Sequence, residues 1–112
     1  RVEDVNWTTV DISSNEENTS TGATLNYCIK NGICYMSILN IGFKTETQAI
    51  ILGANSVPKS SSDYCWCPLV GVADPSYSVL VHPTIYGGLE HHVVRSTSLV
   101  YSGLFSYPVA ET

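Results

Sequence analysis

The stretch from Leu25 to Leu39 reads LNYCIKNGICYMSIL, and it decides the fold class. Two runs of alternating apolar and polar residues flank Asn31-Gly32, a pair that favours the two-residue type I′ turn of a β-hairpin. Such a turn pairs Lys30 with Ile33 and gathers on one face the side chains that we expect to be core: Leu25, Tyr27, Ile29, Cys34, Met36 and Ile38. The opposite face is more mixed: Asn26, Cys28, Lys30, Tyr35 and Ser37.

Short runs rich in Val, Ile, Thr and Tyr recur along the rest of the 112 residues, and none has the spacing of an amphipathic helix. They include VNWTTVDI from Val5, DYCWCPLVGVA from Asp63, a run from Ser76 to His82, and the closing SLVYSGLFSYP. We therefore predict about seven to nine short strands in an all-β domain, built as a compact antiparallel β-barrel or a jelly-roll-like sandwich. The length allows one domain, residues 1–112.

The charge excludes some classes of partner. Ten Asp and Glu outnumber five Lys and Arg, and no basic stripe could neutralise phosphates, so we expect no nucleic-acid partner. No apolar run approaches the roughly 20 residues of a membrane span, so we expect no membrane partner. Charged residues make up only 13% of the chain, which favours a surface partly covered by neighbouring chains. Because the chain opens on Arg1, we interpret it as a fragment of a longer protein.

The four cysteines are interpreted from strand geometry. Cys28 and Cys34 point to opposite faces of the hairpin, and a bridge between Cys65 and Cys67 would buckle a strand, so neither pair favours a disulfide. A zinc site is the alternative, since Cys65 and Cys67 could be joined by His82, His91 or His92, but the spacing is unlike that of structural zinc sites. We expect no metal or other cofactor, with Cys34, Cys65 and Cys67 as small buried residues assembled in a reducing compartment.

Aromatic and polar side chains suggest where a ligand would bind. In a regular strand, Tyr64 and Trp66 lie on the face opposite the two cysteines. Trp66 is then either buried against a second sheet or a partner subunit, or a platform for stacking a sugar. A two-residue turn at Gly87-Gly88 would place five polar or aromatic side chains on one face: His82, Thr84, Tyr86, His91 and Arg95. Such a face suits a polyol or a phosphate. The alternatives are that the face is ordinary surface or that Pro83 breaks the register.

Motifs for catalysis are missing from the sequence. It has no Gly-x-Ser-x-Gly elbow, no His-Glu-x-x-His pair and no phosphate-binding glycine loop. Asp63 could pair with Asp74 or Glu90 as the carboxylates of a glycosidase, but ten acidic residues would offer many such pairs. We therefore expect a protein that is not an enzyme, with a small hydrolase or a zinc-dependent enzyme as the alternative.

Five short motifs follow one another along the chain: WTTV (Trp7 to Val10), Y-x(3)-N-G-x-x-Y (Tyr27 to Tyr35), VP (Val57-Pro58), YGG (Tyr86 to Gly88) and SGLFSYP (Ser102 to Pro108). Their order resembles the C-terminal receptor-binding head domain of bacteriophage tail-fibre and baseplate proteins, from phages and prophages of Gram-positive bacteria. The resemblance spans Val5 to Pro108. The four cysteines and the acidic loop NEEN (Asn15 to Asn18) depart from the usual pattern of that family.

The resemblance implies a homotrimer at the tip of a fibre, assembled in the bacterial cytoplasm and carried on the virion with other tail or baseplate proteins. It also implies non-catalytic binding of host cell-wall saccharide or of teichoic-acid-like polymers. Pockets of the family combine an aromatic residue with His, Asp and Arg, and residues of these types occur here as Asp63, Trp66, His82, His91 and Arg95. The expected hairpin adds Tyr86 to the candidate ligand-binding residues. The competing hypothesis is a purely structural, trimerising β-module.

Overall fold

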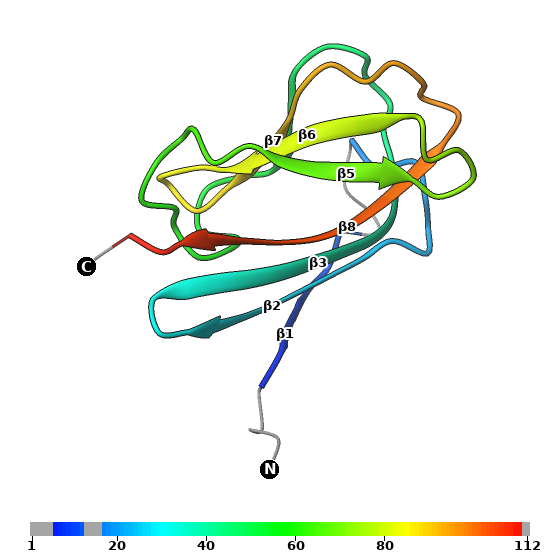
Figure 1. Cartoon of the computed structure of the whole chain (residues 1–112). Helices are drawn as coiled ribbons and strands as arrows, with labels where there is room; N and C mark the ends of the chain where they lie inside the picture. Colours follow the sequence, from blue (N-terminus) through cyan, green and yellow to red (C-terminus); the bar gives the residue numbers. More distant parts are fainter. Residues whose placement is uncertain (1–5, 13–16, 111–112) are drawn as a thin grey trace.

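The protein is a single antiparallel sheet of eight strands, and the computed structural model describes residues 6–12 and 17–110. Within that part of the chain there is no helix, and so none that could cross a membrane. The strands lie in the order β1-β2-β3-β8-β5-β6-β7-β4 (Figure 1). Their bounds are β1 Thr8–Val10, β2 Thr24–Lys30, β3 Ile33–Gly42, β4 Ala49–Leu52, β5 Cys67–Gly71, β6 Ser78–Pro83, β7 Leu89–His91 and β8 Val100–Pro108.

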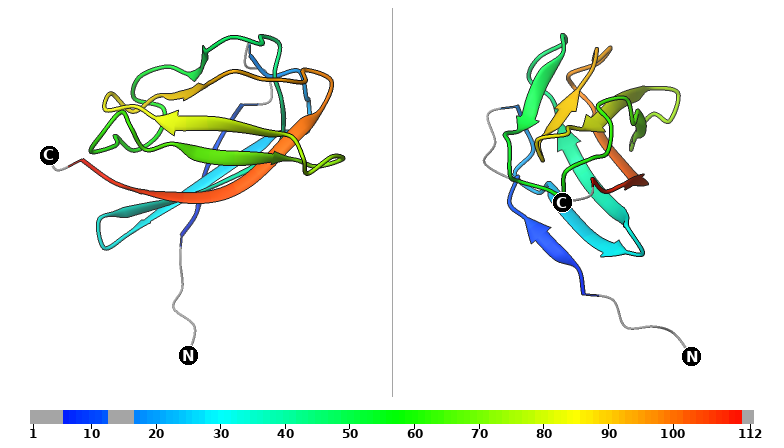
Figure 2. Two further views of the ribbon diagram at one scale, coloured as in Figure 1. Left: turned by 45° about the horizontal axis from the view of Figure 1, so that its top comes forward. Right: turned by 90° about the vertical axis from the view of Figure 1, so that its left-hand side faces the viewer.

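The sheet curls into a half-barrel around one apolar core. Figure 1 and Figure 2 show β1, β2 and β3 on one side of the curl and β5, β6 and β7 on the other, with β8 between them. Leu25 and Met36 from the first side meet Val81 and Leu89 from the second in the buried core. The prediction of an all-β antiparallel fold with about seven to nine strands is confirmed.

The hairpin of β2 and β3 has the predicted turn and register. Asn31 and Gly32 both have positive φ angles, 53° and 77°, as a type I′ turn requires. Lys30 pairs with Ile33, and the expected core face is buried at Leu25, Cys34, Met36 and Ile38. Tyr27 is half-buried against that core.

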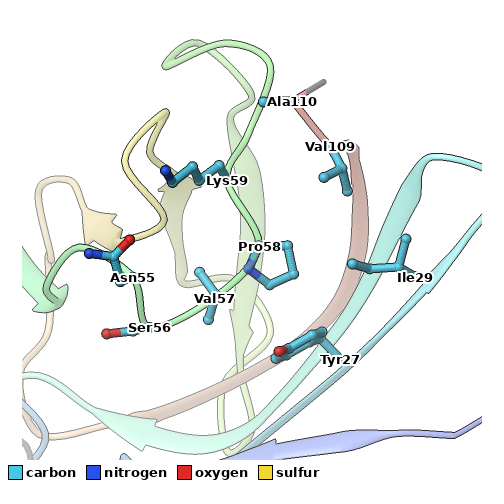
Figure 3. Close-up of a pocket in the computed structure, with 9 residues that line it drawn as sticks. All are labelled: Tyr27, Ile29, Asn55, Ser56, Val57, Pro58, Lys59, Val109 and Ala110. Atoms are coloured by element: carbon cyan, nitrogen blue, oxygen red, sulfur yellow. The ribbon is translucent and has the colours of Figure 1, made fainter. Parts of the chain in front are cut away.

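The prediction that Ile29 belongs to the core is wrong, because 51% of this residue is exposed. Ile29 lies near the turn end of β2, where the curled sheet is open and a groove separates it from the loop with Val57 and Pro58 (Figure 3). A face that is continuous in the sequence pattern is therefore buried along only part of its length.

A β-bulge bends β3 in its second half. The pairing with β8 shifts between Ile38 and Ile41, and Asn40 between them has φ 58°. The Asn40 N–H donates a hydrogen bond to Ser102 Oγ at 2.9 Å. Because the bulge inserts an extra residue, Ile38 and Ile41 both point into the core although their spacing is odd.

The acidic loop after β1 is attached to the sheet through Glu17 and Asn18. Asn15 and Glu16 of this loop lie outside the described residues. The buried Asn18 amide donates to Ile12 O and Ser20 O, each at 2.8 Å. Its carbonyl oxygen accepts from the N–H groups of Ser20 and Gly42. One side chain thus satisfies four backbone groups where the loop meets the end of β3.

The prediction that DYCWC forms a strand is wrong, because β5 begins only at Cys67. Side-chain hydroxyls turn the preceding segment instead: Ser60 Oγ accepts from the Ser62 N–H, and Ser62 Oγ accepts from the Tyr64 N–H. Such local bonds compete with the hydrogen bonds of a sheet. Trp66 and Tyr64 therefore project from a loop.

All four cysteines carry free thiols. The predicted burial of Cys34 and Cys67 is confirmed, and Cys65 is half-buried against the core. Cys28, on the outer face of the hairpin, is also buried. Burial, reinforced by the neighbouring Cys65, raises the pKa of the Cys67 thiol to about 11, so this thiol is protonated and unreactive at neutral pH.

Candidate functional site

A polar pocket with aromatic walls lies where the loop before β5 meets β6 and β7. Its volume is about 280 Å³. Four of the residues predicted to bind a ligand line it together: Asp63, Trp66, His82 and Tyr86. Four further residues complete the lining: Gln48, Tyr64, Thr84 and Glu90. We call it the Trp66 pocket.

The turn that forms one side of the pocket is longer than predicted. Pro83 pairs with Leu89, so five residues, 84–88, connect β6 to β7 where the sequence predicted a two-residue turn at Gly87-Gly88. The Thr84 hydroxyl closes this loop by accepting hydrogen bonds from the N–H groups of Tyr86 and Gly88. The change in register is odd, and an odd change exchanges the two faces of a strand.

Because of this register, His91 faces the core and Glu90 faces the pocket, the reverse of the prediction. His91 is fully buried, with its ring 4.6 Å from that of Phe43 and its Nε2 3.4 Å from Glu17 Oε2. Arg95 also lies away from the pocket lining, with its guanidinium 5.6 Å from the Tyr77 ring. The structure therefore does not bring His91 and Arg95 to the pocket.

Trp66 is held by two imidazoles that approach its ring at a steep angle. The centroid of the His82 ring lies 4.8 Å from that of Trp66, and the His92 ring lies 4.2 Å away. These edge contacts orient the indole, and 44% of the Trp66 residue remains exposed. Trp66 thus packs against two imidazoles and also lines the pocket. Whether it stacks on a sugar stays a prediction.

His92 is uncharged at neutral pH. Its desolvation, and to a smaller extent the neighbouring His82, lowers the pKa of the imidazole below its ordinary value of 6.5. Its Nε2 is buried and has no hydrogen-bond partner within residues 6–12 and 17–110. The ring therefore serves as an apolar support for Trp66.

The polar side of the pocket is organised by two carboxylates. Glu90 Oε1 accepts a hydrogen bond from Gln48 Nε2 at 3.0 Å and lies 3.3 Å from His82 Nε2. Asp63 Oδ1 accepts from the Ile85 N–H at 2.9 Å, which ties the loop before β5 to the turn after β6. These contacts fix the direction of both carboxylates before any ligand arrives.

Sequence reasoning missed Gln48 and Glu90 as pocket residues. Gln48 directly precedes β4, and β4 pairs with β7, a neighbour that no local sequence signal indicates. The sequence presents Glu90 only as a partner of Asp63 in a catalytic pair, and the structure does place both carboxylates in one pocket. Asp74, the alternative partner, accepts hydrogen bonds from Ser76 in the turn between β5 and β6.

A second hollow, of about 540 Å³, lies at the open end of the curl (Figure 3). Val57 and Pro58 of the loop face Tyr27, Ile29 and Val109 across it. Asn55, Ser56 and Lys59 add polar groups to this lining, but none of the residues predicted to bind a ligand lies in it. We therefore take the Trp66 pocket as the candidate site.

The part of the chain that the structure describes contains no group of three His, Cys, Asp or Glu side chains placed to hold a metal ion. No known protein family matches this chain, and neither the curated proteins nor the solved structures contain a match to it. The resemblance to phage head domains therefore stays a prediction from the sequence, and function is argued from the pocket.

Proposed function

We propose that this chain is a non-catalytic receptor-binding head that recognises a saccharide on a host cell surface through the Trp66 pocket. The observation that carries the proposal is a half-exposed tryptophan, packed against two imidazoles, in one pocket with two hydrogen-bonded carboxylates. Sugars present both an apolar C–H face and a rim of hydroxyl groups. An aromatic ring matches the face, and carboxylate and amide groups match the hydroxyls.

The size of the pocket supports binding of a small unit. Ligand pockets for drug-sized molecules run from about 300 to 1,000 Å³, and this pocket of about 280 Å³ lies just below that range. It suits one sugar unit of a polymer. Binding by one such pocket is expected to be weak, so useful adhesion requires several copies acting together.

An apolar outer face supports assembly into a homotrimer, which we propose together with recognition. Trp7 of the segment before β1, Tyr35 of β3 and Leu104 of β8 line a hollow of about 360 Å³ above the buried Cys28, and Lys30 completes the lining. Leu104 is 74% exposed and Trp7 is 49% exposed. Contiguous apolar side chains of this kind are typical of protein contact surfaces. We call these three residues the outer patch.

The experiment that tests recognition compares two half-exposed tryptophans. Purified wall polysaccharides and teichoic acids from Gram-positive bacteria are cut to short fragments, so that each measurement reports one site. Trp66→Ala is expected to weaken binding about 30-fold, as truncation of a central aromatic contact does. Trp7→Ala, outside the pocket, is expected to leave fragment binding unchanged.

Loss of binding in both variants, or in neither, contradicts the proposed site. If no wall fragment binds the unmodified protein, while the domain still forms trimers, the purely structural trimerising module is favoured. The outer patch is the observation that supports that second candidate.

A glycoside hydrolase is a third candidate, because Asp63 and Glu90 lie in one pocket. Two carboxylates across a glycosidic bond are the usual catalytic pair. Release of reducing ends from a bound wall polymer, abolished by Asp63→Asn, would establish hydrolysis. The proposed receptor-binding function predicts no release.

A further inference from the structure

We propose that the Trp66 pocket selects saccharide units that carry an ammonium group, such as a free amino sugar or a sugar bearing an aminoacyl ester. This inference deepens the recognition function proposed above and rests on it. It concerns the charge of the ligand, for which the sequence favoured a neutral polyol or a phosphate.

The charges that line the pocket favour a cation. Asp63 and Glu90 are its carboxylates, and none of the lining residues is Lys or Arg. Arg95, which would have neutralised a phosphate, lies beside Tyr77 instead. A phosphate would therefore meet two negative groups, whereas an ammonium group would find two partners of opposite charge.

The imidazoles do not reverse this balance. His92 stays neutral because desolvation lowers its pKa. His82, when protonated, adds one positive charge, and its Nε2 already lies 3.3 Å from Glu90 Oε1. Two carboxylates against at most one imidazolium leave the pocket negative.

Three aromatic rings add a second attraction for cations. Tyr64, Trp66 and Tyr86 line the same pocket as the carboxylates, and all three are substantially exposed. The face of an aromatic ring attracts an ammonium group, most strongly for tryptophan. The same faces also stack on the C–H groups of the sugar, so one set of residues reads both parts of the ligand.

Contacts within the protein hold each carboxylate through one oxygen. Glu90 uses Oε1 for both Gln48 and His82. Asp63 uses Oδ1 for the Ile85 N–H. Because these contacts hold the carboxylates in place, little side-chain entropy is lost when a cation binds.

The test compares chitosan and chitin oligosaccharides of equal length, which differ only in whether the amino group is free or acetylated. At a pH where the amine is charged, the chitosan fragment is expected to bind about tenfold more tightly, given the added ion pairing and cation–π attraction. Glu90→Gln is expected to remove most of that preference while keeping the hydrogen bond from Gln48. Asp74→Asn removes the same charge outside the pocket and is expected to keep the preference.

Equal or tighter binding of the chitin fragment, or no binding of either, overturns the selection of ammonium sugars. An equal loss in Asp74→Asn and Glu90→Gln also overturns it, because the attraction would then be to the net charge of −5. These failures are separable from failure of the proposed function. That function is tested with the wall fragments instead: it fails if none of them binds the unmodified protein, or if Trp66→Ala and Trp7→Ala do not differ in their effect on binding.

Discussion

At the scale of single residues, Asn18 is the buried polar group on which the first connection depends. Asn18→Asp replaces an amide that donates to Ile12 O and Ser20 O with a carboxylate that faces both carbonyls. We expect a loss of about 2–4 kcal/mol in the free energy of unfolding, because one carboxylate oxygen would face two carbonyl oxygens, although the other still accepts from the N–H groups of Ser20 and Gly42. Urea denaturation followed by tryptophan fluorescence measures this change.

The control for Asn18 is Asn26→Asp. Asn26 lies on the outer face of β2, where its oxygen accepts a hydrogen bond from Thr9 Oγ1, and a carboxylate can accept the same bond. The free energy of unfolding should change little there. Equal stability of the two variants would contradict the role given to Asn18.

His92 gives stability a dependence on pH. Its pKa is lowered in the folded protein, so below the ordinary value of 6.5 the unfolded chain binds the proton more readily. The free energy of unfolding should therefore fall as the pH drops through this region. His92→Gln is expected to make the fall shallower, measured by urea titrations at several pH values, while His82 and His91 remain in both proteins. An unchanged slope would show that His92 is not desolvated.

At the scale of elements, the two β-turns of the sequence show what local signals can predict. Asn31-Gly32 determines its own turn, and the register of β2 and β3 follows residue by residue. Gly87-Gly88 does not form the expected two-residue turn, because the Thr84 hydroxyl and the loop at Asn55 hold the chain in a five-residue connection. The contact with Asn55 joins residues about 30 positions apart, and no pattern within the turn reveals it.

The candidate site was predictable to a similar extent. Asp63, Trp66, His82 and Tyr86 are polar or aromatic residues beside turns, where ligands commonly bind, and the structure brings them together. The sequence assigned Glu90 and His91 to the wrong faces of β7, because the face of each residue depends on the register between β6 and β7. Arg95 comes after β7 has ended, so strand alternation could not place it.

Gly87→Ala tests the turn beside the pocket. Gly87 has φ 85°, and a Cβ there would come within 2.8 Å of Val57 O. We expect a loss of about 1–3 kcal/mol in the free energy of unfolding, because both the backbone angle and the contact oppose the methyl group. Gly22→Ala is the control, since a methyl group at Gly22 would meet nothing within 4 Å. Thermal denaturation of the two variants should separate them clearly, and equal melting temperatures would contradict this account of the turn.

At the scale of the whole molecule, the outer patch is expected to join three copies of the chain. Light scattering should give a mass near three times the 12.2 kDa of one chain. Leu104→Asp should yield monomers that remain folded, because Leu104 is 74% exposed within a single chain. Val93→Asp changes an exposed apolar residue outside the patch and should leave the mass unchanged. A monomer at every concentration of the unmodified protein would contradict the trimer.

The central claim is that the Trp66 pocket binds the ligand, and the most direct measurement is an NMR titration of the ¹⁵N-labelled protein with a wall saccharide fragment. We predict shifts concentrated at the indole N–H of Trp66, which lines the pocket, and at the Gln48 side-chain amide and the backbone N–H of Ile85, which donate to the two carboxylates. Shifts confined instead to the groove between Tyr27 and Val57, or to the outer patch, would contradict the account.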